Sequence, residues 1–353
     1  MIEYIVIELI IFLWGICSWN GKKNKNLFWP GLMLILFSGM RGDFTSDYTS
    51  YANYFHRINR NETLLDILNF KSKYSMEKGY VLLNKFVGIF SESSVVYFIV
   101  ISALTMILLI RFIKRYSPIP WLSLFLFVTI GDYFASFNLV RQVLAAAICL
   151  NAIDYVKKKD IKRYILIIVI AASIHASALI MIPMYFILQM RIEKKIFLIY
   201  GLCCGILFMS LDFVINIGQN IFPKYRNYSY GMKGGTINAI IPYIGILMFI
   251  CYSLYFKKTD CDMDSVDNKI CFNSLIWTLI FGVLAIKVYI FNRFMYFFKP
   301  FTIVLIPNIL RKYQNSKERN SYIISIVVLG ILFTLITLSG TGYDPYYTIL
   351  GEI

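Results

Sequence analysis

Apolar runs recur along almost the whole chain, and short polar connections separate them. A helix needs about 20 apolar residues to cross the hydrocarbon core of a bilayer. We predict about twelve crossings, of which two are short segments within 163–190 and the others lie at 2–18, 27–40, 94–112, 118–131, 138–156, 196–216, 239–256, 270–290, 294–310 and 321–338. The runs are continuous rather than alternating, which excludes an outer-membrane β-barrel. The pattern predicts an all-α polytopic integral membrane protein with one membrane domain over residues 1–353.

The longest polar interval covers residues 41–93. Its second half, Glu77-Lys78-Gly79-Tyr80 followed by VLLNKFVGIF, is apolar for only about ten residues, which is too short to cross a bilayer. We therefore expect a long extracytoplasmic loop that carries one short amphipathic helix. This helix would lie on the membrane surface or dip into it as a re-entrant segment.

Composition and charge agree with a membrane protein. Hydrophobic residues make up 58% of the 353 residues, more than in a soluble globular protein of this length. The net charge of +15 is explained by cytoplasmic loops, which are rich in Lys and Arg. The basic runs lack the interleaved aromatic residues of a base-stacking surface, so we expect no nucleic acid partner. Placing these runs inside puts the N-terminus and the 41–93 loop outside.

Residues 163–190 are flanked by basic runs on both sides, at 157–163 and 191–195. One crossing would put one of these runs outside, so we predict two short segments that meet at Ser173-Ile174-His175-Ala176-Ser177. His175 is then expected at or near an outer turn.

The polar residues expected in the outer half could serve a phosphorylated sugar substrate. Arginines such as Arg141 and Arg293 suit a diphosphate, because guanidinium groups bind phosphate oxygens in bidentate fashion. Tyrosines suit sugar rings, and a carboxylate or His175 could accept a proton from a sugar hydroxyl. The alternatives are that Arg141 reaches lipid headgroups and that Arg293 is an interfacial anchor. Lys287 and Lys299 are expected to reach the headgroups.

No motif indicates a metal or a nucleotide cofactor. The chain has no DxD, no HExxH and no Cys/His cluster, and neither a Walker A motif nor a GxGxxG sequence. We therefore predict an activity that needs no metal and no cofactor.

An ordered set of motifs resembles the EpsG family of Wzy-type polysaccharide polymerases. The resemblance runs from about residue 40 to 300 and is carried by Arg41 with Asp47-Tyr48 and Tyr51, Glu77-Lys78-Gly79-Tyr80 with Leu82-Leu83-Asn84, Asn138-Leu139-Val140-Arg141-Gln142, His175-Ala176-Ser177-Ala178-Leu179, and Asn292-Arg293 with Tyr296-Phe297. Each motif is weak alone, and the specificity comes from their order and spacing.

The resemblance implies a bacterial polymerase of O-antigen, capsule or exopolysaccharide, with a fold like the GT-C-like polymerase and ligase group. Such a glycosyltransferase joins undecaprenyl-diphosphate-linked oligosaccharide repeat units at the outer face of the inner (cytoplasmic) membrane. The lipid diphosphate is the leaving group, and the active site faces the periplasm or exterior. The expected partners are the lipid-linked glycan donor and acceptor, membrane lipid and a chain-length regulator.

The resemblance also implies roles for single residues. We expect Arg141, Arg293 and Arg41 to bind the diphosphate, and His175, then Glu77 and Asp47, to be the candidates for the general base. The residues expected to contact sugar are Tyr48, Tyr80, Gln142, Asn292 and Tyr296.

Two other functions fit parts of the sequence. A flippase for the same lipid-linked sugars would also have about twelve spans, but it needs charges reachable from both sides of the membrane. A membrane acyltransferase needs a catalytic histidine near an early helix, and this chain has no histidine before His56.

Overall fold

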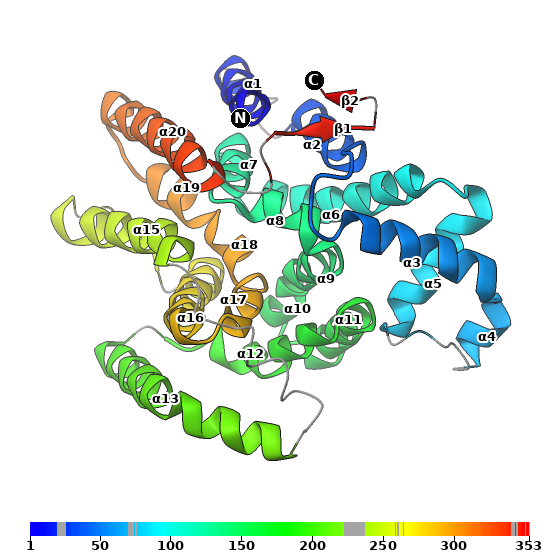
Figure 1. Ribbon diagram of the computed structural model, residues 1–353. Helices are drawn as coiled ribbons and strands as arrows, with labels where there is room; N and C mark the ends of the chain where they lie inside the picture. The colour runs from blue at the N-terminus through cyan, green and yellow to red at the C-terminus, as the bar shows by residue number, and fades with distance from the viewer. Residues whose placement is uncertain are drawn as a thin grey trace. The chain divides into compact units, whose positions relative to one another are not determined.

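The computed structural model describes residues 1–19, 26–69, 74, 76–191, 193–221, 237–257, 259, 261–263, 265–339, 343, 345–349 and 351–352. The chain divides into two compact units, one of Met1–Ile182 with Leu310–Ile353 and one of Pro183–Ile309. Both are built almost entirely of helices (Figure 1). The connection expected between residues 216 and 239 lies mostly outside the described residues.

The first unit contains the N-terminal helices and the last long helix. Its elements are α1 (Ile2–Trp19), α2 (Phe28–Gly39), α3 (Tyr48–Asn61), α4 (Leu64–Leu68), α5 (Lys78–Phe90), α6 (Ser94–Tyr116), α7 (Pro120–Thr129), α8 (Asp132–Asn138), α9 (Val140–Leu150), α10 (Ile153–Lys157), α11 (Ile161–Ile174), the 3-10 helix η1 (Ala176–Ile180), the start of α12 (Met181–Ile187), α20 (Ser316–Leu338), β1 (Tyr347–Thr348) and β2 (Gly351–Glu352). Helix α6 contacts α2, α9 and α5, and α9 in turn contacts α11.

The second unit is arranged around one long helix. Its elements are α13 (Lys194–Ile221), η3 (Ile237–Ala239), α15 (Ile241–Cys251), the π-helical turn η4 (Tyr252–Phe256), α16 (Val266–Lys287), α17 (Ile290–Met295), α18 (Lys299–Thr302) and α19 (Leu305–Leu310), which ends at the unit boundary. Helix α16 contacts α13, α15, α17 and α18.

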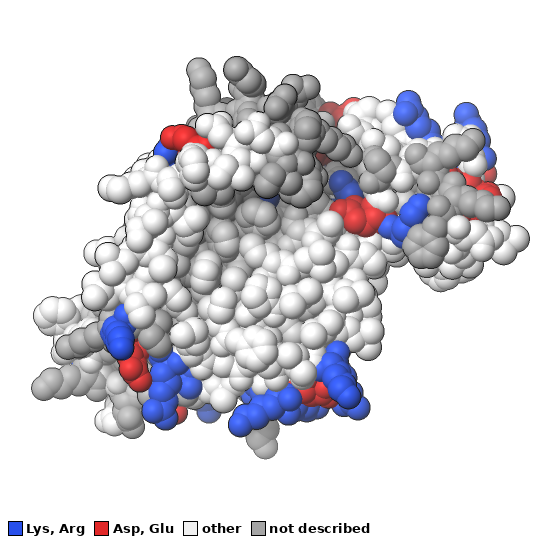
Figure 2. Space-filling view, turned by 90° about the horizontal axis from the view of Figure 1, so that it is seen from below, with Lys and Arg blue, Asp and Glu red and all other residues white. Residues whose placement is uncertain are grey.

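Membrane-spanning character is confirmed for part of the chain. Among the described residues, α6, α16 and α20 are long and apolar enough to cross a membrane, and the bent pair α7–α8 would make a fourth. Figure 2 shows charged side chains gathered in groups with wide uncharged areas between them. The all-α membrane class is therefore confirmed, and about twelve crossings stays a prediction.

Backbone chemistry explains why some predicted spans are divided. Helices α7 and α8 lie between the predicted starts of two spans and are separated by a 53° bend, where Gly131 has φ 88°, a conformation that suits glycine. The run 294–310 is split into α17, α18 and α19. Pro300 and Pro307 lie in this run and lack the N–H needed inside a continuous helix. The break predicted within 163–190 occurs as expected, with α11 ending just before His175.

The 41–93 segment differs from the predicted loop with one short helix. The described part holds three helices, of which α5 corresponds to the predicted one, and α3 and α4 precede it. Tyr51, Phe55 and Ile58 are buried on one face of α3. This spacing of four and three residues is that of an amphipathic helix, and α3 buries that face against α5 and α6.

Helices α2 and α6 run antiparallel and approach closely at two glycines. A Cβ on Gly31 would lie 2.4 Å from Ile110 Cδ1, and one on Gly39 would lie 2.7 Å from the Cα of Ile99. Small residues allow such close packing of helices in membranes. The N-terminal end of α2 therefore lies beside the C-terminal end of α6.

Two further contacts join the ends of the first unit. Glu8 is fully buried in α1 and accepts a 2.5 Å hydrogen bond from Thr334 Oγ1 of α20. The segment after α2 pairs with the C-terminal tail, where Arg41 forms an antiparallel bridge with Thr348. Gly42 N–H donates to the Tyr347 carbonyl oxygen at 2.7 Å, and Ile349 N–H donates to the Met40 carbonyl oxygen at 3.0 Å.

Candidate functional site

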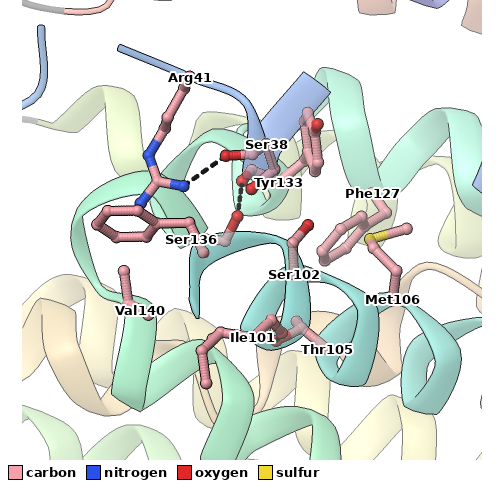
Figure 3. A pocket seen from close by; sticks show the side chains of 11 residues that line it. Ser38, Arg41, Ile101, Ser102, Thr105, Met106, Phe127, Tyr133, Ser136 and Val140 are labelled. Atoms are coloured by element: carbon pink, nitrogen blue, oxygen red, sulfur yellow. Dashed lines mark hydrogen bonds between the residues drawn. The ribbon is translucent and has the colours of Figure 1, made fainter. Parts of the chain in front are cut away.

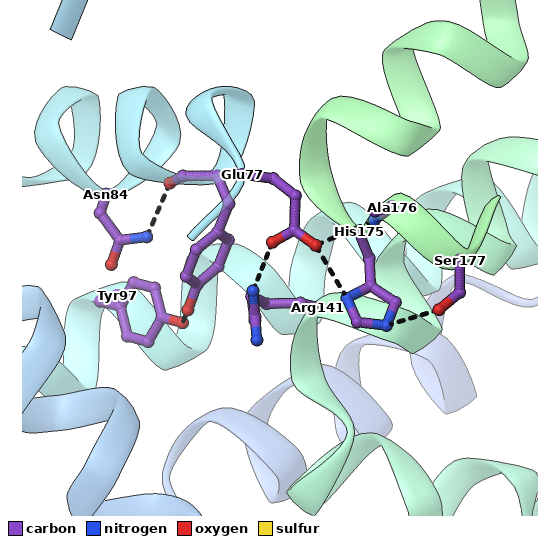
Figure 4. Close-up of polar contacts among 8 residues, drawn as sticks. Glu77, Asn84, Tyr97, Arg141, His175, Ala176 and Ser177 are labelled. Atoms are coloured by element: carbon purple, nitrogen blue, oxygen red, sulfur yellow. Dashed lines mark hydrogen bonds and ion pairs between the residues drawn. The ribbon is translucent and has the colours of Figure 1, made fainter. Parts of the chain in front are cut away.

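Glu77, Arg141 and His175 meet in the first unit, although they are far apart in the sequence (Figure 4). Arg141 Nη1 donates to Glu77 Oε2 at 2.5 Å. His175 Nδ1 lies 3.4 Å from Glu77 Oε1, and the backbone N–H of Ala176 donates to the same oxygen at 2.9 Å. One carboxylate thus holds a guanidinium and an imidazole, and we call these three residues the Glu77 cluster.

Each member of the Glu77 cluster sits at the end of a helix. Glu77 is the extended residue before α5, Arg141 lies in the first turn of α9, and His175 is extended between α11 and η1. Gly79 brings α5 close to α11, because a Cβ there would lie 2.2 Å from Ser173 Oγ and 2.8 Å from the Ser173 carbonyl oxygen. The absence of a side chain at residue 79 therefore lets Glu77 reach the turn that carries His175.

Two buried tyrosines, Tyr51 and Tyr80, contact the Arg141 guanidinium. The Arg141 guanidinium carbon lies 5.4 Å from the centre of the fully buried Tyr80 ring, in range of a cation–π contact. Tyr51 adds a second electrostatic contact with Arg141, and the Tyr80 and Tyr97 hydroxyls are hydrogen-bonded to each other. These aromatic contacts fix the position of the guanidinium.

The surroundings of Glu77 favour its charged form. Burial is the largest single influence and would raise the pKa of this carboxyl, because it removes water from the charged form. The contact with His175, the Ala176 N–H and the charge of Arg141 act in the opposite direction. Their combined effect is larger and lowers the pKa of Glu77 to about 2.

The Glu77 cluster remains accessible. The side chains of Glu77, Arg141 and His175 are 21%, 22% and 15% exposed. The carboxylate beside Nδ1 favours the tautomer with the proton on that nitrogen, which leaves the Nε2 lone pair available. His175 Nε2 lies 3.3 Å from Ser177 Oγ. The arrangement can bind an anion at Arg141 and accept a proton at His175.

Arg41 lies in a buried environment (Figure 3). Only 2% of this residue is exposed, and its guanidinium donates to the carbonyl oxygens of Ser38 at 2.5 Å and Phe137 at 3.0 Å. The Phe98 ring centre lies 4.4 Å from the guanidinium carbon. The cavity beside Arg41 measures about 10 Å³, which leaves room for about one water molecule. These contacts tie α2, α6 and α8 together.

The other predicted residues of the first unit differ in exposure. Asp47 and Tyr48 are partly exposed at the start of α3, and the Tyr48 ring stacks on Phe98 at 4.6 Å. The Asp47 backbone N–H lies 3.5 Å from Asn138 Oδ1. Gln142, like Tyr80, is buried, with 2% of its surface exposed.

The remaining predicted residues belong to the second unit. Asn292, Arg293 and Tyr296 are partly exposed on α17 and directly after it. The expectation that Lys299 reaches headgroups is wrong, because it is 5% exposed and its Nζ lies 4.3 Å from the centre of the Tyr296 ring. Lys287 forms an ion pair with Asp212 at 2.7 Å.

Two contributors to the Glu77 cluster were not identified from the sequence. The Ala176 N–H has no side-chain signal, because any residue supplies a backbone donor. Tyr97 lies among other aromatic residues of an apolar run, so nothing distinguishes it there. Among the residues that the structure describes, no group of three or more His, Cys, Asp or Glu is placed to hold a metal ion.

Comparison with known proteins places the chain in a family. The model of the EpsG family matches residues 9–348. The amylovoran biosynthesis protein AmsC of Erwinia amylovora is 23% identical over 235 residues, which covers 64% of this chain and 62% of AmsC. The matched part is thus less than two thirds of AmsC. No solved structure matches the chain.

Proposed function

Because the chain belongs to the EpsG family, we propose that it is a Wzy-type polysaccharide polymerase of the bacterial cytoplasmic membrane. It joins undecaprenyl-diphosphate-linked repeat units by glycosyl transfer at the outer face. The observation that carries this proposal is the Glu77 cluster, in which one carboxylate orients a phosphate-binding guanidinium and a proton-accepting imidazole on an accessible surface. The name of AmsC, a protein of amylovoran biosynthesis, supports polysaccharide chemistry.

In the proposed reaction an acceptor hydroxyl of one repeat unit attacks the anomeric carbon of another. The bond from this carbon to the diphosphate oxygen breaks, and the lipid diphosphate leaves with the electron pair. Arg141 binds the diphosphate and stabilises the charge that develops on it. His175 Nε2 accepts the proton of the attacking hydroxyl.

Glu77 then has an orienting role. A carboxylate with a pKa of about 2 is a weak base, so His175 is the better proton acceptor of the two. Glu77 holds the Nδ1–H tautomer of His175 and fixes the Arg141 guanidinium. Asp47, which is partly exposed, is the alternative base.

The other residues receive supporting roles. We assign the partly exposed Tyr48 to sugar binding, and the buried Tyr80 and Gln142 to the support of Arg141. Arg41, bound to two backbone carbonyl oxygens, has a structural role. For the residues of the second unit, the roles that the resemblance implies stay predictions: diphosphate binding by Arg293, and sugar contacts by Asn292 and Tyr296.

Replacement of Arg141 tests the diphosphate site. Arg141→Ala should lower polymerisation by about 10²–10³-fold, and Arg141→Lys should restore only part of it, because an ammonium cannot bind two oxygens in a fork. The measurement is the polysaccharide ladder on a gel, in a strain that lacks its own copy and at matched protein level. Arg163→Ala, at an exposed arginine paired with Asp160, is the control. Normal ladders for both Arg141 variants would contradict the assignment.

Replacement of His175 tests the base. His175→Ala should lower the polymerisation rate by about 10²–10⁴-fold, with the folded protein present at normal level. His56→Ala, at the other and exposed histidine, should leave the ladder unchanged. Full polymerisation by His175→Ala would move the base to Asp47.

Loss of the gene product separates polymerase from flippase. Without a polymerase, single repeat units still reach the outer face and remain on the carrier or its acceptor. Without a flippase, no repeat unit appears outside, and that result would overturn the proposed function.

A further inference from the structure

A groove runs between α2 and α6 in the first unit. Its volume is about 640 Å³. Apolar side chains make up most of the wall: Leu27, Phe28, Leu32, Ile35, Ile107 and Ile110. Phe28 and Ile107 are 59% and 60% exposed, so the groove opens outward on a helix pair of which α6 is long and apolar enough to span a membrane. An apolar chain would find contacts on both sides of this groove.

Three cations lie at one end of the groove. Arg111, Lys114 and Arg115 complete its lining and are exposed in the last turns of α6. Arg115 is bound to Asp154 at 2.5 Å, which compensates its charge. Arg111 and Lys114 form no ion pair or hydrogen bond with another described residue. At one end of the apolar groove there are therefore two cations, Arg111 and Lys114, whose charge no described residue compensates.

This basic end is remote from the Glu77 cluster. Tyr97, at the start of α6, is hydrogen-bonded to Tyr80 beside Arg141. Arg111 lies fourteen residues further along the same helix, and at 1.5 Å per residue the separation is about 21 Å. That distance is most of a hydrocarbon core of about 30 Å. The cations therefore face the membrane side opposite to the Glu77 cluster.

We propose that this groove binds an anionic glycerophospholipid from the leaflet opposite to the Glu77 cluster. An acyl chain lies between α2 and α6, and the phosphate contacts Arg111 and Lys114. Basic pockets between membrane helices on the cytoplasmic side are suited to such headgroups. The lipid-linked substrate of the proposed function carries its diphosphate on the other side, so this site is separate from the reaction.

The test uses the full chain, purified in a neutral detergent, with dioleoylphosphatidylglycerol as the probe and native mass spectrometry as the readout. Arg111→Gln with Lys114→Gln should weaken binding roughly 30-fold, since each cation contributes to phosphate attraction. Arg311→Gln with Lys312→Gln removes the same charge from an exposed loop that does not line the groove. This control should bind as the unchanged protein does.

A second pair of variants tests the apolar part. Ile107→Trp fills the groove at an exposed position and should also weaken binding, whereas Ile170→Trp, on the exposed face of α11, should not. Inorganic phosphate should not displace the lipid. Unchanged affinity in the Arg111/Lys114 double variant or in Ile107→Trp would overturn the proposal. Displacement by inorganic phosphate would reduce the site to an anion site and overturn it as well.

Discussion

At the scale of single residues, the protonation of Glu77 governs its whole cluster. Its folded pKa of about 2 is below its ordinary value of 4.5. The charged form therefore stabilises the folded state at pH values above the ordinary value. This stabilisation is lost as the pH falls from about 5 toward 2.

Glu77→Gln should remove this contribution. We expect a loss of about 2 kcal/mol in the free energy of unfolding at pH 7, typical of hydrogen bonds to charged groups. The difference from the unchanged protein should shrink as the pH falls from about 5 toward 2, because the unfolded chain then binds a proton at Glu77 that the folded protein must release to keep its contacts. Unfolding in mixed micelles at pH 7, 5 and 3 measures this.

The control for this experiment is Glu92→Gln, at an exposed carboxylate near the end of α5. It should leave unfolding close to that of the unchanged protein at each pH. A Glu77→Gln effect that stays constant between pH 7 and 3 would show that lost packing, rather than lost charge, causes it.

At the scale of elements, the contact of α5 with α11 positions the Glu77 cluster. The two helices meet at Gly79 and Ser173. Glu77 lies two residues before Gly79, and His175 lies two residues after Ser173. Any shift of α5 away from α11 thus separates Glu77 from His175.

Gly79→Ala should destabilise the protein by about 1–3 kcal/mol, the usual effect of overpacking. It should also lower polymerisation, although residue 79 has no functional group. Gly205→Ala is the matched control, because a Cβ there would meet nothing within 4 Å among the described residues. Thermal unfolding and the ladder are measured together, and a Gly79→Ala protein with unchanged behaviour in both would contradict the close-contact argument.

At the scale of the whole molecule, the sequence predicted the class of fold better than it predicted where the individual helices begin and end. Apolar run lengths identified α6, α16 and α20 as helices long enough to span a membrane, and the basic flanks predicted the break at His175. The same reasoning treated 294–310 as one span, because hydropathy does not register the missing N–H of Pro300 and Pro307. It also left α3 within a loop, because the burial of Tyr51, Phe55 and Ile58 depends on α5 and α6, which are distant in sequence.

The sequence predicted which residues belong to the candidate site, but it did not predict how they contact one another. Glu77, Arg141 and His175 were each selected as outer polar residues, but nothing in the sequence states that one carboxylate holds the other two. Glu8 was not selected, because a single acidic residue in an apolar run gives no sign of its partner Thr334 in α20. Lys299 was expected to reach the headgroups. The Tyr243 ring that partly covers it belongs to another helix, and the sequence does not show that this helix packs there.

The pairing of residues 40–42 with the C-terminal tail also sets an order of events during synthesis. Gly42 and Met40 reach their partners Tyr347 and Ile349 only after roughly 300 further residues have been made, which at 5–20 residues per second takes about 15–60 s. Until then the newly inserted chain holds Arg41 in a segment whose backbone donors and acceptors lack their final partners. Maturation of this part of the protein is therefore coupled to the arrival of residues 347–349, and a ribosome that stalls before them leaves the earlier helices inserted and this pairing unmade.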